Sequence, residues 1–487
     1  MLIDCQKILV YNEDTDGGGR VLSFGKELNC LMDRYGYRAV DLCMKLDLSK
    51  SYFSRLVSGK ISPRDFALVE SLSGAMELPA HEKRMLVDAY KAAKFGEEFI
   101  TRENAVKRLY DIGFPSFGGK QKLPKTALCS GCAIEGMARI AAAIRLLMAE
   151  EGTAYFVFIP ENQQFCDLLR QDAAERRAEA KWLIYLNGGT DRSAENMLFF
   201  TETISLLLAG NADVRFNYKD IGAYFSSTPF PYMLITDSGT LLLERSCERA
   251  FFWDCVEFSA AYRDFIIESF EKAYPFVRLM TGIEEYLQNW RGMLPGEKGM
   301  KDDLLIVEKW PCIIHEAEYS DISSHIADGE QNDRLARAYT NFMRWSNERL
   351  RTQEMIFTEE GVQEFLKMEK FYEYSRHITK PLPMGLRKIF LQKLIENCQS
   401  NAFNPAIMRD ASFLDSNVRV LNVWKSGIVL IVFDFEECFR VAVLKEKTIS
   451  DALWDYFQKL KKCGMVISKE ETVGILRDAL GENESES

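Results

Sequence analysis

The pattern of apolar and polar positions predicts a series of short helices near the start of the chain. Four apolar residues recur at positions i, i+3, i+4 and i+7 and so share one face of a helix: Ala39, Leu42, Cys43 and Leu46. Asp47 and Leu48 then indicate a tight turn, and Ser49 is a good N-cap for a second helix. Two helices joined in this way are typical of a helix-turn-helix.

The second helix is predicted to be apolar on one face only. Phe53, Leu56 and Val57 face inward, whereas the outward positions are all polar or basic: Lys50, Ser51, Ser54, Arg55 and Ser58. Gly59 is expected to end this helix, and Pro63 prevents it from continuing. A short helix with this outer face has little to bury and is suited to the groove of DNA.

Three further helices are predicted around this pair. The first ends at Gly36, and its inner stripe consists of Leu28, Leu31, Met32 and Tyr35. The fourth follows Pro63, and its inner positions are Phe66, Val69 and Met76. The fifth follows Pro79, and its apolar positions are Leu86, Ala89, Tyr90 and Ala93. We therefore expect a helical domain over residues 21–94, after a flexible segment over residues 1–20.

Residues 21–94 resemble the helix-turn-helix of the XRE family, the type found in Cro and lambda repressor. The matching positions are Leu42, Cys43 (in an Ala position), Leu48, Ser49, Phe53, Ser54, Arg55, Leu56, Gly59 and Pro63. Three positions depart from the family pattern. Asp47 replaces the turn Gly, Val57 replaces a Glu, and Ala39 replaces a Gln that often contacts DNA. The resemblance implies five short helices around one core and binding to double-stranded DNA.

The resemblance also implies which residues touch DNA. The base-edge positions of the family fall on Lys50, Ser51, Tyr52 and Arg55, and the expected phosphate contacts are Arg38, Ser58 and Lys60. One such module covers little DNA, so we expect a homodimer on a palindromic operator.

The remainder of the chain has the pattern of a large α/β region with a mixed sheet. A Gly- and Pro-rich stretch over 95–125 indicates a linker, which leads into a connecting helix that ends near 150. Strands are then expected at 153–159, 181–186 and 214–217, followed by a hairpin through Asp237-Ser238-Gly239 and helices over 260–273 and 276–290. The aromatic-rich residues 251–276 are expected to be mostly core at helical spacing. We predict one effector lobe over 151–300 and a second α/β lobe over 301–487.

An order of helix, strand, hairpin and helix occurs at about 193–274 and again at about 386–462, which predicts two duplicated lobes. This order faintly resembles phospholipase-D-like sensor domains attached to some bacterial and archaeal regulators. Catalytic members of that superfamily carry a His-x-Lys pair in each lobe. None of the histidines of the α/β region (His315, His325, His377) has a lysine two residues later. The resemblance therefore implies lobes without the catalytic motifs.

Charge is distributed unevenly along the 487 residues. The whole chain carries −11, but residues 20–95 hold 13 Lys and Arg against 9 Asp and Glu, a net charge of +4. The positive charge thus lies on the segment expected to meet phosphates. The sequence has no apolar run long enough to span a membrane, and twelve scattered cysteines are typical of reduced thiols. We therefore expect a cytoplasmic bacterial transcriptional regulator.

Candidate chemistry outside the helical domain is sparse. Cys129 and Cys132 are candidates for a redox switch, although buried thiols without a function explain the pair more simply. We expect no metal site, no cofactor and no enzymatic activity, and we expect the α/β region to bind a small-molecule or protein effector. Two alternatives stay open. One is a hydrolase guided by a DNA-binding domain, and the other is an interaction protein of the antitoxin or phage-immunity kind.

Overall fold

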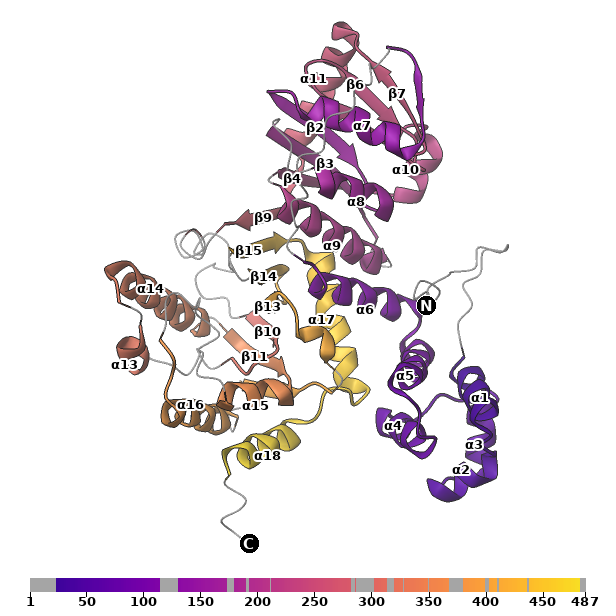
Figure 1. Cartoon of the computed structure of the whole chain (residues 1–487), viewed down its shortest axis with the longest axis vertical. Helices are drawn as coiled ribbons and strands as arrows, with labels where there is room; N and C mark the ends of the chain where they lie inside the picture. Colours follow the sequence, from indigo (N-terminus) through magenta and orange to yellow (C-terminus); the bar gives the residue numbers. More distant parts are fainter. Residues whose placement is uncertain are drawn as a thin grey trace, which may run out of the picture. The chain divides into compact units, whose positions relative to one another are not determined.

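The computed structural model forms two compact units, Met1–Ile100 and Thr101–Ser487 (Figure 1). The structure describes residues 23–113, 130–172, 179–189, 192–210, 212–281, 285, 302–312, 319–326, 328–348, 350–367, 380–398, 403–409, 411–435 and 438–481. The flexible segment predicted over 1–20 lies outside these residues. The predicted fold class is confirmed, because a helical N-terminal region precedes an α/β region with two mixed sheets.

Within residues 23–100, the first unit consists of five helices and the start of a sixth. The five are α1 (Phe24–Tyr35), α2 (Ala39–Lys45), α3 (Lys50–Val57), α4 (Phe66–Ala75) and α5 (Ala80–Phe95). Helix α1 packs on α3 and α5, α2 packs on α3 and α4, and α4 packs on α5. Gly36 ends α1 in the left-handed conformation (φ 71°), as the sequence predicts. Ala39 and Tyr35 are exposed, contrary to the predicted inner stripes, because each lies at a helix end beyond the reach of the core.

The chain passes from the first unit to the second within α6 (Glu97–Tyr110), which lies in the segment predicted as a linker. The first sheet has the strand order β1-β7-β6-β5-β2-β3-β4-β8. Its strands are β1 (Ala133–Glu135), β2 (Thr153–Phe158), β3 (Glu179–Asn187), β4 (Asp213–Lys219), β5 (Tyr232–Ile235), β6 (Thr240–Leu243), β7 (Arg249–Trp253) and β8 (Tyr274–Pro275). The helices of this lobe are α7 (Met137–Met148), α8 (Gln163–Asp172), α9 (Ser193–Ala209), α10 (Ile221–Ser227) and α11 (Val256–Lys272).

The second sheet has the strand order β12-β11-β10-β13-β14-β15-β9. Its strands are β9 (Val277–Met280), β10 (Asp302–Glu308), β11 (Leu350–Phe357), β12 (Phe403–Ile407), β13 (Val418–Trp424), β14 (Ile428–Phe435) and β15 (Cys438–Lys445). The α-helices of this lobe are α13 (Tyr319–Ile322), α14 (Glu330–Asn347), α15 (Glu359–Lys367), α16 (Met384–Asn397), α17 (Lys447–Lys462) and α18 (Lys469–Leu480).

Apart from strand β8, which extends the first sheet beside β4, the two sheets share one topology. In each sheet three neighbouring strands are parallel, β2-β3-β4 in the first and β10-β11-β12 in the second. An antiparallel ladder then continues from the first parallel strand, through β5-β6-β7-β1 and through β13-β14-β15-β9. The last ladder strand precedes all the others along the chain in both lobes, so the two lobes are built to the same plan.

Two sequence predictions about the first lobe are wrong. The helix expected over 276–290 is contradicted at its start, because Val277–Met280 form strand β9, which pairs with β15 of the second sheet. The aromatic residues Phe251–Trp253 belong to strand β7 and not to a helix. Both segments are short strands, and each pairs with a strand far away in the sequence, β9 with β15 and β7 with β1 in addition to the neighbouring β6, so a short apolar run alone cannot distinguish them from helix. In the part of the chain that the structure describes, no helix has the length and apolar character that crossing a bilayer requires.

Candidate functional site

Helix α3 presents a polar and basic face. Ser49 caps the helix, and its Oγ accepts a hydrogen bond from the Tyr52 N–H at 3.2 Å. Phe53 and Leu56 are buried against the other helices of the unit. The outward positions are exposed, as predicted: Lys50, Ser51, Ser54, Arg55 and Ser58. The helix-turn-helix therefore keeps its polar face free while its apolar face holds it in the unit.

The turns on either side of α3 each contain one residue in the left-handed conformation. Asp47 has φ 50°, a left-handed conformation that Asp tolerates better than most residues, so a Gly is not required there. The Leu48 N–H donates to the Cys43 carbonyl at 2.9 Å and closes the turn. At the other end Gly59 has φ 70°, and the Lys60 N–H donates to the Arg55 carbonyl at 2.9 Å.

Three exposed basic side chains lie on α3 and in the turn that follows it. In the part of the helical unit that the structure describes, Lys50, Arg55 and Lys60 make no ion pair with a carboxylate, although acidic residues are common in this unit. All three side chains are exposed. Unpaired, exposed cations clustered on one helix and the turn after it form an attractive surface for phosphate.

The other predicted DNA contacts include two side chains that already form hydrogen bonds within the unit and one whose hydroxyl is buried. Arg38 is 82% exposed, but its guanidinium donates to Asp41 at 2.9 and 3.1 Å and lowers the pKa of that carboxyl. The Ser58 hydroxyl donates to the Arg55 carbonyl at 3.1 Å. The Tyr52 hydroxyl is buried and has no hydrogen-bond partner among the described residues, so it points away from the exposed face of α3.

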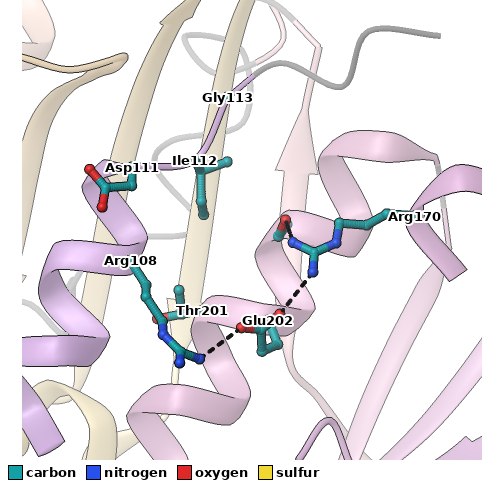
Figure 2. Close-up of a pocket in the computed structure, with 8 residues that line it drawn as sticks. Arg108, Asp111, Ile112, Gly113, Arg170, Thr201 and Glu202 are labelled. Carbon is teal, nitrogen blue, oxygen red and sulfur yellow. Dashed lines mark hydrogen bonds and ion pairs between the residues drawn. The ribbon is translucent and has the colours of Figure 1, made fainter. Parts of the chain in front are cut away.

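A cavity of about 350 Å³ lies in the second unit where α6 meets α8 and α9 (Figure 2). Glu202 of α9 stands at its centre and accepts from Arg108 of α6 at 3.3 Å and from Arg170 of α8 at 3.4 Å. Arg170 also donates to Ser205 Oγ at 2.8 Å. Thr201 donates to the carbonyl of Ala105 at 3.3 Å, which adds a second contact between α9 and α6.

The charges around this cavity are balanced. Burial raises the pKa of Glu202, and the two guanidiniums oppose that shift. Each oxygen of the carboxylate already accepts from one arginine, so a charged ligand would have to displace an existing ion pair. The cavity is thus a polar junction that holds α6 to the first α/β lobe.

The remaining sequence candidates are not assembled into a site. Cys132 is exposed and directly precedes β1, and Cys129 lies outside the described residues. A His-x-Lys pair does occur in the chain, as His81 and Lys83, but it lies in α5 of the helical unit. Neither sheet therefore receives a histidine and lysine with this spacing. Sequence reasoning missed the cluster around Glu202, because its two arginines, Arg108 and Arg170, lie 94 and 32 positions away and no local motif connects them.

No family model matches this sequence, and no curated protein is similar to it. Several solved structures match at low TM-score, and three of them follow. The archaeal chromatin protein TrmBL2, described with a novel mode of DNA binding, has TM-score 0.20 and 14% identity over 41% of this chain and 71% of that one. Polyphosphate kinase from Porphyromonas gingivalis has TM-score 0.19 and 12% identity over 64% of this chain and 47% of that one. Phosphatidylserine synthase from Haemophilus influenzae has TM-score 0.21 and 11% identity over 79% of this chain and 98% of that one.

These comparisons correct one expectation. The sequence analysis predicts a protein without enzymatic activity, but the matched structures include two enzymes. We therefore withdraw that prediction. The TM-scores lie near 0.2, so the similarities assign neither a reaction nor a mode of DNA binding to this chain.

Proposed function

We propose that this chain is a cytoplasmic bacterial regulator that binds a specific DNA sequence through its helical unit. The observation that carries the proposal is the exposed, unpaired set of Lys50, Arg55 and Lys60 on α3 and the turn that follows it. A helix whose outer face is only polar and basic, with no acidic partner, fits the major groove better than it fits a protein core.

The residues take different roles in this proposal. Arg55 and Lys50 are the candidates for hydrogen bonds to guanine O6 and N7, with Ser51 beside them. Lys60, Ser58 and Arg38 are candidates for phosphate contacts, which set the register without reading sequence. The Arg38 guanidinium donates to Asp41 from two of its nitrogen atoms, and its remaining N–H groups can still donate to a phosphate. We assign no base contact to the buried Tyr52 hydroxyl.

The proposal includes a two-fold dimer, because one module of this size contacts too few base pairs for strong specificity. The duplicated α/β lobes would then hold an effector, the dimer contact, or both.

Selection of bound DNA from a random pool by the purified full-length chain, at a stated salt concentration, tests this function. Enrichment of a two-fold symmetric site is the expected result. If the folded protein enriched no sequence, sequence-specific DNA binding would be rejected.

Two alanine substitutions should separate base reading from phosphate binding. Arg55→Ala is expected to lose about 1–3 kcal/mol of discrimination between the selected site and random DNA. Lys60→Ala should weaken both DNAs alike and lower the salt dependence of binding by about one ion. Lys83→Ala is the matched control, because that lysine pairs with Glu70 on α4 and should leave both affinities unchanged. Equal losses on both DNAs for Arg55→Ala would refute its assigned role.

A further inference from the structure

A second cavity, of about 340 Å³, lies in the first α/β lobe. Its floor includes residues near the carboxyl ends of the parallel strands β3 and β4, and α10 and α11 contribute to its walls. Most of the lining is apolar or aromatic, including Tyr185, Tyr224, Phe230 and Phe265. The carboxyl ends of parallel strands are where open α/β sheets commonly bind ligands.

One charged residue lines this cavity, and that residue is Lys219, the last residue of β4. Its Nζ lies 3.9 Å from the ring centre of Tyr185 and 4.4 Å from that of Tyr224. Among the residues that the structure describes, no carboxylate pairs with Lys219 and no acidic side chain lines the cavity. Burial lowers the pKa of Lys219, which is the effect of an ammonium held away from water.

Two other buried or half-buried lysines of this unit are paired with carboxylates. Lys309 is almost completely buried, and its Nζ contacts Glu364 at 2.8 Å and Asp415 at 3.0 Å. Lys461 contacts Glu354 at 2.6 Å. Two aromatic faces stabilise the ammonium of Lys219 in part, but they do not neutralise its charge. Lys219 is partly buried, and a partly buried cation without a counterion is stabilised when a ligand supplies the negative charge.

We infer that this cavity binds a small organic carboxylate, with Lys219 as the cation that pairs with the carboxylate and the aromatic side chains as the walls that enclose the apolar body. The volume is at the lower end of ligand pockets, which suits a molecule of the size of benzoate. A single ammonium with no arginine beside it matches one negative charge better than a phosphate dianion, which is usually held by several donors. Asn217, Thr228 and Ser269 also line the cavity and offer hydrogen bonds to polar groups of the ligand.

This inference goes beyond the proposed DNA binding and does not depend on it. The cavity lies entirely in the second unit, and the experiment below contains no DNA. Failure of one proposal would therefore leave the other standing.

The inference is tested by titrating the full chain against benzoate and hexanoate and measuring their binding by ligand-observed NMR. Benzamide serves as the neutral analogue and phenyl phosphate as the dianionic one. We expect saturable binding of at least one carboxylate, and a loss of about tenfold or more for the neutral analogue, because the charge-assisted hydrogen bond is removed. Equal binding of benzoate and benzamide, tighter binding of phenyl phosphate, or no saturable binding of either carboxylate would each overturn it.

Substitutions identify the lysine responsible. Lys219→Met should weaken carboxylate binding about tenfold or more, and Lys219→Arg should restore part of it because it keeps the charge. Lys181→Met is the matched control, because Lys181 also lies over a tyrosine ring of the same sheet, at 5.6 Å from Tyr155, but does not line the cavity. Lys219→Met should unfold no earlier than the parent protein, since it removes an unpaired, partly buried charge. Unchanged carboxylate affinity in folded Lys219→Met would reject the assignment.

Discussion

Gly361→Ala is expected to lower the free energy of unfolding of the second unit by about 3 kcal/mol or more. Gly361 lies in the first turn of α15, which packs on the end of β10. A methyl group there would overlap the carbonyl oxygen of Lys309 and lie 2.7 Å from its carbonyl carbon. That oxygen cannot easily move, because it accepts from the Thr358 N–H at 3.1 Å and from the Thr358 hydroxyl at 3.0 Å. The whole first turn of α15 must therefore shift.

Tryptophan fluorescence during denaturation by urea measures this effect, since all seven tryptophans of the chain follow residue 101 and so report the second unit. Gly385→Ala is the matched control. Gly385 also lies in the first turn of a helix, α16, but a methyl group there meets no atom within 4 Å. That substitution should be neutral or stabilise by up to about 1 kcal/mol, because Ala is the better helix former. A midpoint for Gly361→Ala equal to that of Gly385→Ala would contradict the packing explanation.

The helical unit could be predicted because its signals are local. Ser49 as an N-cap, Asp47 in a left-handed turn and Gly36 as a helix end each act through neighbouring backbone atoms, and the structure confirms all three. The same holds for the hairpin of β5 and β6, whose turn Asp237-Ser238-Gly239 is readable without knowing the rest of the sheet. Such caps and turns depend only on neighbouring residues, so they can be predicted without knowledge of the tertiary structure.

The sheet edges could not be predicted for the opposite reason. Val277–Met280 form a strand only because β15, more than 150 residues later, offers an open edge to pair with. The order helix, strand, hairpin and helix was enough to indicate a duplication. The shared topology, however, includes β1 and β9, two short strands whose identity depends on their distant partners.

The candidate sites in the second unit likewise leave no trace in the sequence. Lys219 is one of many lysines, and its isolation depends on Tyr185 and Tyr224, which come from another strand and a helix. Glu202 meets Arg108 from a helix 94 positions away. In both cases the chemistry depends on what surrounds a common residue type, and the surroundings exist only in the folded chain.

Gly25→Ala should disrupt the helical unit and abolish specific DNA binding. Gly25 lies in the first turn of α1, against the end of α3. A methyl group on it would lie 2.5 Å from the Val57 carbonyl oxygen, 2.6 Å from the Leu56 carbonyl oxygen and 2.6 Å from the backbone nitrogen of Gly59. All three are backbone atoms at the end of the proposed recognition helix, so no side-chain rotation relieves the overlap. Forcing α1 away from α3 should cost about 3 kcal/mol, a large share of the stability of so small a unit.

Gly25→Ala is expected to destabilise the helical unit alone, so the two units can be compared within one protein. During denaturation by urea, helix content measured by circular dichroism should show a transition at lower urea concentration for Gly25→Ala than for the parent protein. The tryptophan fluorescence transition of the second unit should be unchanged. Gly74→Ala is the matched control, because Gly74 is helical within α4 of the same unit and a methyl group on it meets no atom within 4 Å. It should retain DNA binding and the parent stability. If Gly25→Ala kept full affinity for the selected DNA, then either α3 does not need its contact with α1 or it is not the DNA-binding element. Its circular dichroism transition would distinguish the two, because an early transition with intact binding would remove α3 from the interface.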